Sequence, residues 1–188
     1  NRGTWLHTRF QHFDLPAARI NSWMDKKLQD RMEELSTTCN QLGISGESKQ
    51  KVMFREEKDF HCSVGWYEAA KTIPCYEGMS FEEFLCSPHW HRLGTEYRLI
   101  TSVKTNDRSK PLKCVAQPDL LLYHKGQNSV WILDLKSTSY DPKVRAMGIP
   151  VDFQTEHYMF TVDALLKSGQ FQRAFNIPSD ARLGGMMH

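Results

Sequence analysis

The sequence predicts a mixed α/β domain of the α+β kind, in which helices come first and a β-meander and a final helix follow. Three observations indicate this fold: apolar residues at helical spacing in the first third, β-rich texture from residue 96, and a helical pattern after residue 150. A chain of 188 residues can bury roughly 70% of its unfolded surface. We therefore expect one globular domain over residues 1–188.

The composition excludes two broad classes of protein. With 40% hydrophobic and 11% aromatic residues the chain is not a solvated, disordered tail. A mean hydropathy of −0.54 and the lack of an 18-residue apolar run exclude a membrane span, so we expect no membrane partner. The net charge is only +2, from 24 basic and 22 acidic residues. A polyanionic partner would therefore meet a local basic patch and not the field of the whole molecule.

Cysteine usage favours an intracellular, reducing compartment. The five cysteines are odd in number and contain no C-x-x-C pair, which fits neither a disulfide framework nor a zinc ribbon. Cytoplasm, nucleus and mitochondrial matrix are equally compatible with this pattern. The chain starts at Asn1 inside what reads as structured sequence, which fits a removed presequence or a larger polypeptide.

The first half of the chain reads as helical. Apolar residues recur at loose helical spacing at Leu15, Ile20, Trp23, Leu28, Met32 and Leu35. Two glycines between residues 42 and 48 end this helix. In a second helical region Ser80 and Glu83 form a predicted capping box, and Ser87 with Pro88 stops the helix.

The second half reads as three strands and a helix. We expect strands over residues 97–103, 112–123 and 129–136, and the turn at 125–128 joins the last two into a hairpin. After a loop punctuated by proline and glycine, residues 151–167 are predicted as a helix that Gly169 closes.

Two acids and a lysine stand out on the predicted hairpin. Asp119 falls near the middle of one predicted strand, and Asp134 and Lys136 fall at the end of the next. Residues i and i+2 of a strand share a face about 6.6 Å apart, so Asp134 and Lys136 project together. Buried charges are costly unless they are paired, metal-bound or solvated. Two carboxylates beside Mg²⁺ or Mn²⁺ would explain them, and a salt bridge at a sheet edge is the alternative.

A set of motifs in chain order resembles the RecB-type exonuclease branch of the PD-(D/E)XK nuclease superfamily. The motifs of that branch run G-x-x-x-H, E, (P)D, (D/E)-x-K and Q-x-x-x-Y. The matching residues are Gly3 to His7, Glu96, Pro118-Asp119, Asp134 to Lys136 and Gln154 to Tyr158. The branch includes phage recombination and mitochondrial genome maintenance exonucleases. The resemblance implies a restriction-endonuclease-like core, with a central mixed sheet flanked by helices.

The resemblance also implies a role for each matching residue. A Mg²⁺ or Mn²⁺ ion would be bound by the imidazole of His7, the carboxylates of Asp119 and Asp134, and the backbone carbonyl of Leu135. The imidazole ligand favours Mn²⁺ over Mg²⁺. Lys136 would orient or deprotonate the attacking water, and Glu96 would support the site. Gln154 and Tyr158, at i and i+4 of one helix, would organise the lysine and contact the nucleic acid backbone.

Competing interpretations remain open for several of these residues. Tyr158 also fits an ordinary amphipathic helix, and a lone histidine such as His7 is often structural. His89-Trp90-His91 lacks a third metal partner, so we expect it at the surface. Because no cysteine follows Cys114, an iron–sulfur cluster is not expected, and the lack of a Walker A pattern excludes a helicase motor in this chain.

Substrate contacts are predicted from basic residues beside the strands. One group lies in and beside the loop between the first two strands, and the other follows the D-x-K strand: Lys104, Arg108, Lys110 and Lys113, then Lys143 and Arg145. Solvated loops are the alternative for both groups. Residues 96–168 would form the catalytic meander and helix, and residues 8–95 a mainly helical arch or lid. Trp23, Trp66, Tyr67 and Trp90 are available there for base stacking or for the core.

These observations predict a metal-dependent nuclease, foremost a single-stranded DNA exonuclease with a possible replication or recombination partner. One alternative is an endonuclease on RNA or DNA, because the cap-snatching endonucleases of segmented viruses share the H, PD and x-K order. Another is a catalytically silent nucleic-acid-binding module. A purely structural interaction domain explains neither the ordered motifs nor the acids on apolar strands.

Overall fold

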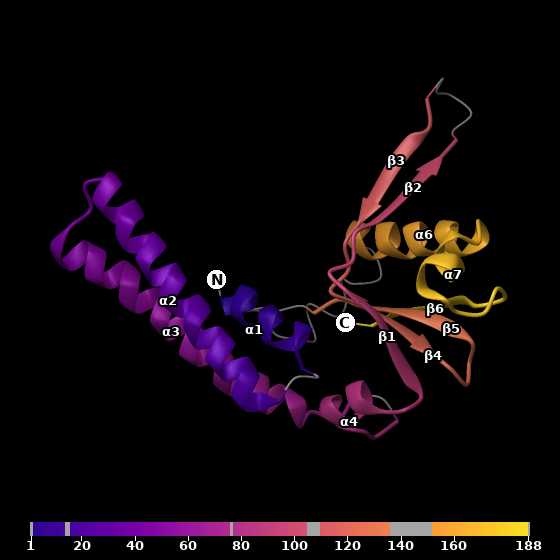
Figure 1. The fold of residues 1–188 in the computed structure, drawn as a ribbon, viewed down its shortest axis with the longest axis horizontal. Coiled ribbons are helices and arrows are strands. Elements are labelled where there is room, and N and C mark those ends of the chain that lie inside the picture. Colours follow the sequence, from indigo (N-terminus) through magenta and orange to yellow (C-terminus); the bar gives the residue numbers. More distant parts are fainter. Residues whose placement is uncertain (1, 14–15, 76, 105–109, 136–151, 188) are drawn as a thin grey trace. The chain divides into compact units, whose positions relative to one another are not determined.

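The computed structural model describes residues 2–13, 16–75, 77–104, 110–135 and 152–187, without the side chains at positions 2–4, 7, 11 and 17. The chain divides into two compact units, Asn1–Cys86 and Ser87–His188. The first unit is helical, and the second contains all the described strands (Figure 1). Each unit has a hydrophobic cluster of its own. A single domain over 1–188 and a lid formed by residues 8–95 stay predictions.

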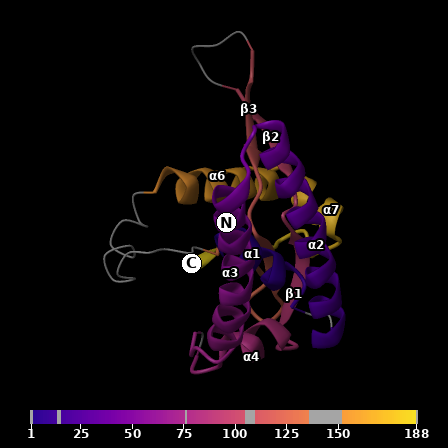
Figure 2. The ribbon, with the colours of Figure 1, turned by 90° about the vertical axis from the view of Figure 1, so that its left-hand side faces the viewer.

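The first unit is built on two long helices that lie side by side (Figure 2). Its helices are α1 (Arg2–Gln11), α2 (Ala17–Gln41), α3 (Gly46–Lys71) and α4 (Phe81–Cys86). The predicted break at residues 42–48 is confirmed, since α2 ends at Gln41 and α3 begins at Gly46. Apolar side chains one or more turns apart form the cluster between the helices: Trp5, Ile20, Met24 and Phe60. No helix of the described part of the chain is long and apolar enough to cross a membrane.

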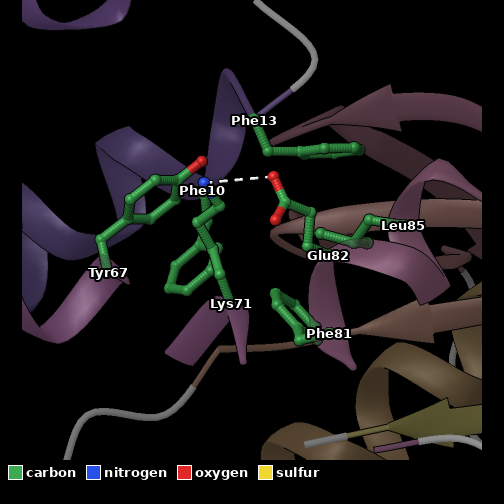
Figure 3. Close-up of a pocket in the computed structure, with 7 residues that line it drawn as sticks. All are labelled: Phe10, Phe13, Tyr67, Lys71, Phe81, Glu82 and Leu85. Carbon is green, nitrogen blue, oxygen red and sulfur yellow. Dashed lines mark ion pairs between the residues drawn. The ribbon is translucent and has the colours of Figure 1, made fainter. Parts of the chain in front are cut away.

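The short helix α4 closes the first unit through a cap and a small apolar pocket. The predicted capping box is confirmed: the Ser80 N–H donates to the Glu83 carboxylate at 2.8 Å, and the Glu83 N–H donates to Ser80 Oγ at 3.3 Å. Lys71 Nζ lies 3.1 Å from Glu82 Oε1, and this hydrogen bond raises the pKa of the lysine. Figure 3 shows this ion pair among Phe10, Phe13, Tyr67, Phe81 and Leu85. The pocket is therefore part of the packing of α4.

The strands of the second unit form two separate sheets. A four-stranded sheet has the order β1-β4-β5-β6, from β1 (Trp90–Thr95), β4 (Leu120–His124), β5 (Ser129–Leu133) and β6 (Arg182–Met187). The pairs β1–β4 and β4–β5 are antiparallel and β5–β6 is parallel, so the sheet is mixed. The second sheet, here called the ribbon, is the antiparallel pair β2 (Leu99–Val103) and β3 (Leu112–Ala116).

One face of the four-stranded sheet packs against helices. These are α6 (Phe153–Lys167) and α7 (Gln170–Phe175) (Figure 1). The cluster between them includes residues of β4, β5 and α6, among them Leu121, Val130, Ile132, Val162 and Leu165. Gly169 follows α6 with φ +69°, which confirms the predicted glycine stop. A mixed sheet flanked by helices is the fold class that the sequence predicts.

The strand predictions need correction. The strand predicted over 129–136 ends at Leu133, so Asp134 follows the strand and does not lie within it. The strand predicted over 112–123 is two strands in different sheets, because Pro118 has no N–H to donate to a ladder and the chain changes sheet there. Asp119 is consequently not in the middle of a strand, but directly precedes β4. Strands β1 and β6 were not predicted, since each contains glycine and weak alternation.

Two aromatic side chains proposed for base stacking belong to the core. Tyr67 and Trp90 are only 5% and 7% exposed. Trp90 begins β1 and contacts the ring of Trp131, so the core alternative holds for this residue, while His89 and His91 are exposed as predicted. Trp66, by contrast, is 44% exposed, while Trp23 packs against the cluster of the first unit.

Candidate active site

Asp119 and Asp134 lie opposite each other at one end of the central hairpin. Asp119 directly precedes β4 and Asp134 directly follows β5, and the adjoining residues Leu120 and Leu133 are paired across the two strands. The Leu135 N–H donates a hydrogen bond to Asp119 Oδ2 at 2.6 Å. The hairpin therefore brings together two acids that are separated by a turn and two strands in the sequence.

Hydrogen bonds join the two aspartates to the ends of the neighbouring strands β1 and β6, and β1 is followed by a third acid. Glu96 directly follows β1, and its N–H donates to the Asp119 carbonyl at 3.0 Å. The Asp134 N–H donates to the carbonyl of Met187, the last residue of β6, also at 3.0 Å. Glu96 has φ +45°, a left-handed conformation that few residues other than glycine adopt and that is enriched at functional sites. Three predicted site residues thus lie side by side at one end of the sheet.

The two aspartates are buried, and Glu96 is exposed. Asp119 and Asp134 have 8% and 4% of their surface exposed, beside Val130 and Ile132, which are fully buried. Carboxylates at such depth are costly unless charge and hydrogen bonds compensate them, and oxygen donors of this kind fit a hard divalent cation. Among the described side chains, no three His, Cys, Asp or Glu residues form a metal cluster. Asp119, Asp134 and the backbone of Leu135 are thus the described part of the predicted ligand set.

Helix α6 is tied to the connection that carries Asp119. Asp152 caps the helix by accepting from the Gln154 N–H at 3.0 Å. Gln154 Nε2 donates to the Tyr158 hydroxyl at 2.9 Å, and this hydroxyl donates to the Gln117 carbonyl at 3.0 Å. Gln154 and Tyr158 therefore reach the same point, as their spacing predicts, two residues before Asp119.

His157 is a site neighbour that sequence reasoning missed. Its Nε2 lies 2.8 Å from the carbonyl oxygen of Val115, and because a carbonyl only accepts, this contact requires the proton on Nε2. His157 and Tyr158 thus join α6 to Val115 in β3 and to Gln117 directly after β3, a pair of contacts here called the α6 clamp. No spacing rule in the sequence singles out His157, because its partner is a backbone atom 42 positions away.

Other predicted site residues lie outside the described residues or away from the acids. His7 is in α1, but its side chain is not described, and Lys136, Arg108, Lys143 and Arg145 fall in undescribed segments. The exposed residues Lys104 and Lys113 lie on the ribbon, directly after β2 and within β3. The assignment of roles to all these residues stays a prediction.

Comparisons with known proteins agree with the arrangement of the acids. A family model described as the PD-(D/E)XK nuclease superfamily matches residues 1–183. No curated protein and no solved structure matches the chain. The matched span covers nearly all of the 188 residues, and it includes the Pro118-Asp119 and Asp134-Leu135-Lys136 motifs. The chain therefore belongs to the PD-(D/E)XK nuclease superfamily.

Proposed function

We propose that this nuclease belongs to the RecB-type branch and degrades single-stranded DNA from an end. The observation that carries the proposal is the hydrogen-bonded pair Gln154–Tyr158, which reaches the Gln117 carbonyl beside Asp119. A glutamine and a tyrosine at this spacing after a D-x-K motif are what the chain shares with that branch. The same pair argues against the cap-snatching type of endonuclease.

The residues at the end of the hairpin fit a divalent metal. Asp119, Asp134 and the Leu135 carbonyl would hold Mg²⁺ or Mn²⁺, with His7 as a further ligand. When bound, such an ion supplies Lewis-acid stabilisation of the charge that develops at the phosphodiester. Members of this superfamily generally use divalent metals of this kind, which agrees with the buried oxygen donors.

The remaining residues position the reactants. Lys136 would orient the water and accept its proton at Nζ when neutral, or only orient it when charged. Glu96, whose backbone is bonded to Asp119, would accept a hydrogen bond from a water beside the acids. Gln154 and Tyr158 would support Lys136 and contact a phosphate of the substrate, while Lys104, Lys113, Lys143 and Arg145 would bind other phosphates.

A cleavage assay with a matched lysine control tests the proposal. End-labelled linear and circular single-stranded DNA, duplex DNA and single-stranded RNA are each incubated with Mn²⁺, Mg²⁺ or EDTA. We expect metal-dependent loss of linear but not circular single-stranded DNA. Lys136→Ala and Asp119→Asn should each lower kcat by about 10³-fold, which corresponds to about 4 kcal/mol. Lys125→Ala, in the exposed β4–β5 turn, should leave the rate unchanged.

Each other outcome of the assay has a distinct meaning. Cleavage of circles, or preference for RNA, would keep the site but replace the exonuclease with an endonuclease. Without metal-dependent cleavage of any substrate, the silent binding module would be favoured. A Mn²⁺ titration of thermal unfolding separates these cases, because a functional site at 100-fold excess over Kd adds about 2.7 kcal/mol of stability, which Asp134→Asn should abolish.

A further inference from the structure

The ribbon has two unlike faces. Side chains of an antiparallel pair alternate between faces, and paired residues share a face. On the inner face the paired residues Leu99 and Ala116 are 3% and 1% exposed and belong to the core beneath α6, and Cys114 is 6% exposed. The residues that alternate with these form the outer face, and all of them are exposed. They are Arg98, Ile100, Ser102, Lys104, Lys113, Val115 and Gln117.

The outer face combines positive charge with an apolar centre. Ile100 and Val115 are paired across the strands and are 43% and 38% exposed. Lys113 lies on the same face as this pair within β3, and the alternation continued by one residue at each end of β2 puts Arg98 and Lys104 on that face as well. Residues 97–104 and 110–117 contain no Asp or Glu. Within the described residues none of the three cations forms a salt bridge. The face is therefore complementary to a polyanion that also presents apolar surface.

The outer face leads to the acids along β3. Val115 and Gln117 are on this face, and Asp119 follows two residues after Gln117. Four residues of extended chain, from Val115 to Asp119, span at most about 14 Å. The α6 clamp holds the β3 end of this path through Val115 and Gln117. A strand bound on the ribbon could thus continue to the acid pair.

Edge protection accounts for only part of this pattern. Lysines on exposed strands discourage pairing with other chains. That role does not require all three cations to share the unpacked face, and it does not explain two exposed β-branched side chains at its centre. Solvated strand positions in antiparallel sheets are ordinarily polar.

We propose that the outer face of the β2–β3 ribbon binds the sugar–phosphate backbone of the nucleic acid substrate, with a base or sugar on Ile100 and Val115. The inference rests on the proposed function in that the bound strand is the one presented to Asp119 and Asp134. It assigns Arg98, Lys104 and Lys113 to phosphates, and it assigns no phosphate to Lys110, which lies outside the alternation of this face.

The salt dependence of binding tests the assignment of the cations. Affinity of the full chain for labelled single-stranded DNA is measured by anisotropy in EDTA, where cleavage does not occur, over a range of NaCl concentrations. Each phosphate contact contributes about 0.7 to the slope of log K against log salt. The variant R98Q/K104Q/K113Q should therefore flatten the slope by about 2. The matched variant K125Q/K167Q/R182Q removes three exposed cations of the same unit and should leave the slope unchanged.

The apolar pair Ile100 and Val115 should affect the affinity for DNA differently from the cations. I100A/V115A should lower affinity by about tenfold at every salt concentration without changing the slope, because apolar contacts release no counterions. The control I73A/V52A removes side chains that are 56% and 38% exposed in the helical unit, and affinity should not change.

The outcomes separate this inference from the proposed function. An unchanged slope in R98Q/K104Q/K113Q, or an equal loss in the control triple variant, would overturn the ribbon assignment even if the wild type cleaves DNA. A flattened slope in a protein that cleaves nothing would support the ribbon and contradict the exonuclease. Melting temperatures of both triple variants should match the wild type, because all six side chains are exposed.

Discussion

The four-stranded sheet and the ribbon use strands of similar length in opposite ways. In β4 the first four residues are all buried, and the strand is paired on both edges and packs one face against the core beneath α6. In β2, and in β3 from Lys113 onward, burial alternates, because only the inner face packs against the core, whereas Leu112 at the far end of the ribbon is exposed. The four-stranded sheet therefore holds the acids in fixed positions, while the ribbon leaves its outer face accessible to a partner.

Two covalent links join these regions, residues 96–98 and residues 117–119, and each is only three residues long. Residues 117–119 connect β3 of the ribbon to β4 of the sheet, and Pro118 in their middle is fully buried. The carbonyls of Gln117 and Asp119 each accept a hydrogen bond, from Tyr158 and from the Glu96 N–H. The face proposed to bind substrate is thereby connected to the two acids over a short path.

Truncating one isoleucine in each region should give the largest contrast. Ile132 of β5 is fully buried in the core, so Ile132→Ala should cost about 2–5 kcal/mol of unfolding free energy. Ile100 of β2 is 43% exposed, so Ile100→Ala should change stability by less than about 0.5 kcal/mol. Urea denaturation of the two variants measures both values. Equal losses of unfolding free energy in the two variants would show that the outer face of the ribbon is covered, which would contradict the difference between the two regions.

A second prediction concerns the edge of the sheet. Gly184 lies at the irregularity between β5 and β6, where an added Cβ would sit 2.3 Å from Trp131 Nε1. Trp131 is also held by a hydrogen bond from Nε1 to Ser129 Oγ, at 2.9 Å. Gly184→Ala should therefore cost about 1–3 kcal/mol through overpacking.

The same clash offers its own control in a double-mutant cycle. Trp131→Leu removes the ring, so the added penalty of Gly184→Ala should largely disappear in that background. Gly65 in α3 has open space around it, and Gly65→Ala should instead raise stability by about 0.5–1 kcal/mol. A penalty of Gly184→Ala that persists without the indole would point to the backbone as its cause. Thermal unfolding monitors all these variants.

A smaller loss of stability than that of Ile132→Ala or Gly184→Ala is expected at the α6 clamp. Tyr158→Phe keeps the ring but removes the hydroxyl that joins Gln154 and the Gln117 carbonyl, which should cost about 0.5–1.5 kcal/mol. Because the clamp positions the residues before Asp119, Mn²⁺ affinity should fall as well. His157→Ala should act in the same direction, through loss of the bond to Val115. Calorimetric titration with Mn²⁺ measures this effect.

A hydrogen bond at the opposite end of α6 provides the control for the clamp. Gln172 Nε2 donates to the Leu166 carbonyl at 3.0 Å, a contact of the same chemical kind. Gln172→Ala should lower the melting temperature but leave Mn²⁺ affinity unchanged. If it weakens Mn²⁺ binding as much as Tyr158→Phe does, the clamp acts through general stability and not through position.

Much of the secondary structure could be predicted because its causes are local. The capping box of Ser80 and Glu83, the turn at 125–128 and the stop at Gly169 depend on residues within a few positions of each other. The strands β1 and β6 could not be predicted in this way. β6 contains Gly184 and Gly185, and its place beside β5 depends on Trp131, more than 50 residues earlier.

The same distinction between local and long-range causes applies to the candidate site. Residue type and spacing alone identify the candidate side chains, namely the ordered acids, the D-x-K motif, the glutamine and the tyrosine. Only the tertiary structure decided that Asp119 precedes β4, that Glu96 lies beside it, and that His157 reaches Val115. Those facts depend on strand pairing and on backbone acceptors far away in the chain, and neither strand pairing nor a distant carbonyl leaves a mark in the local sequence.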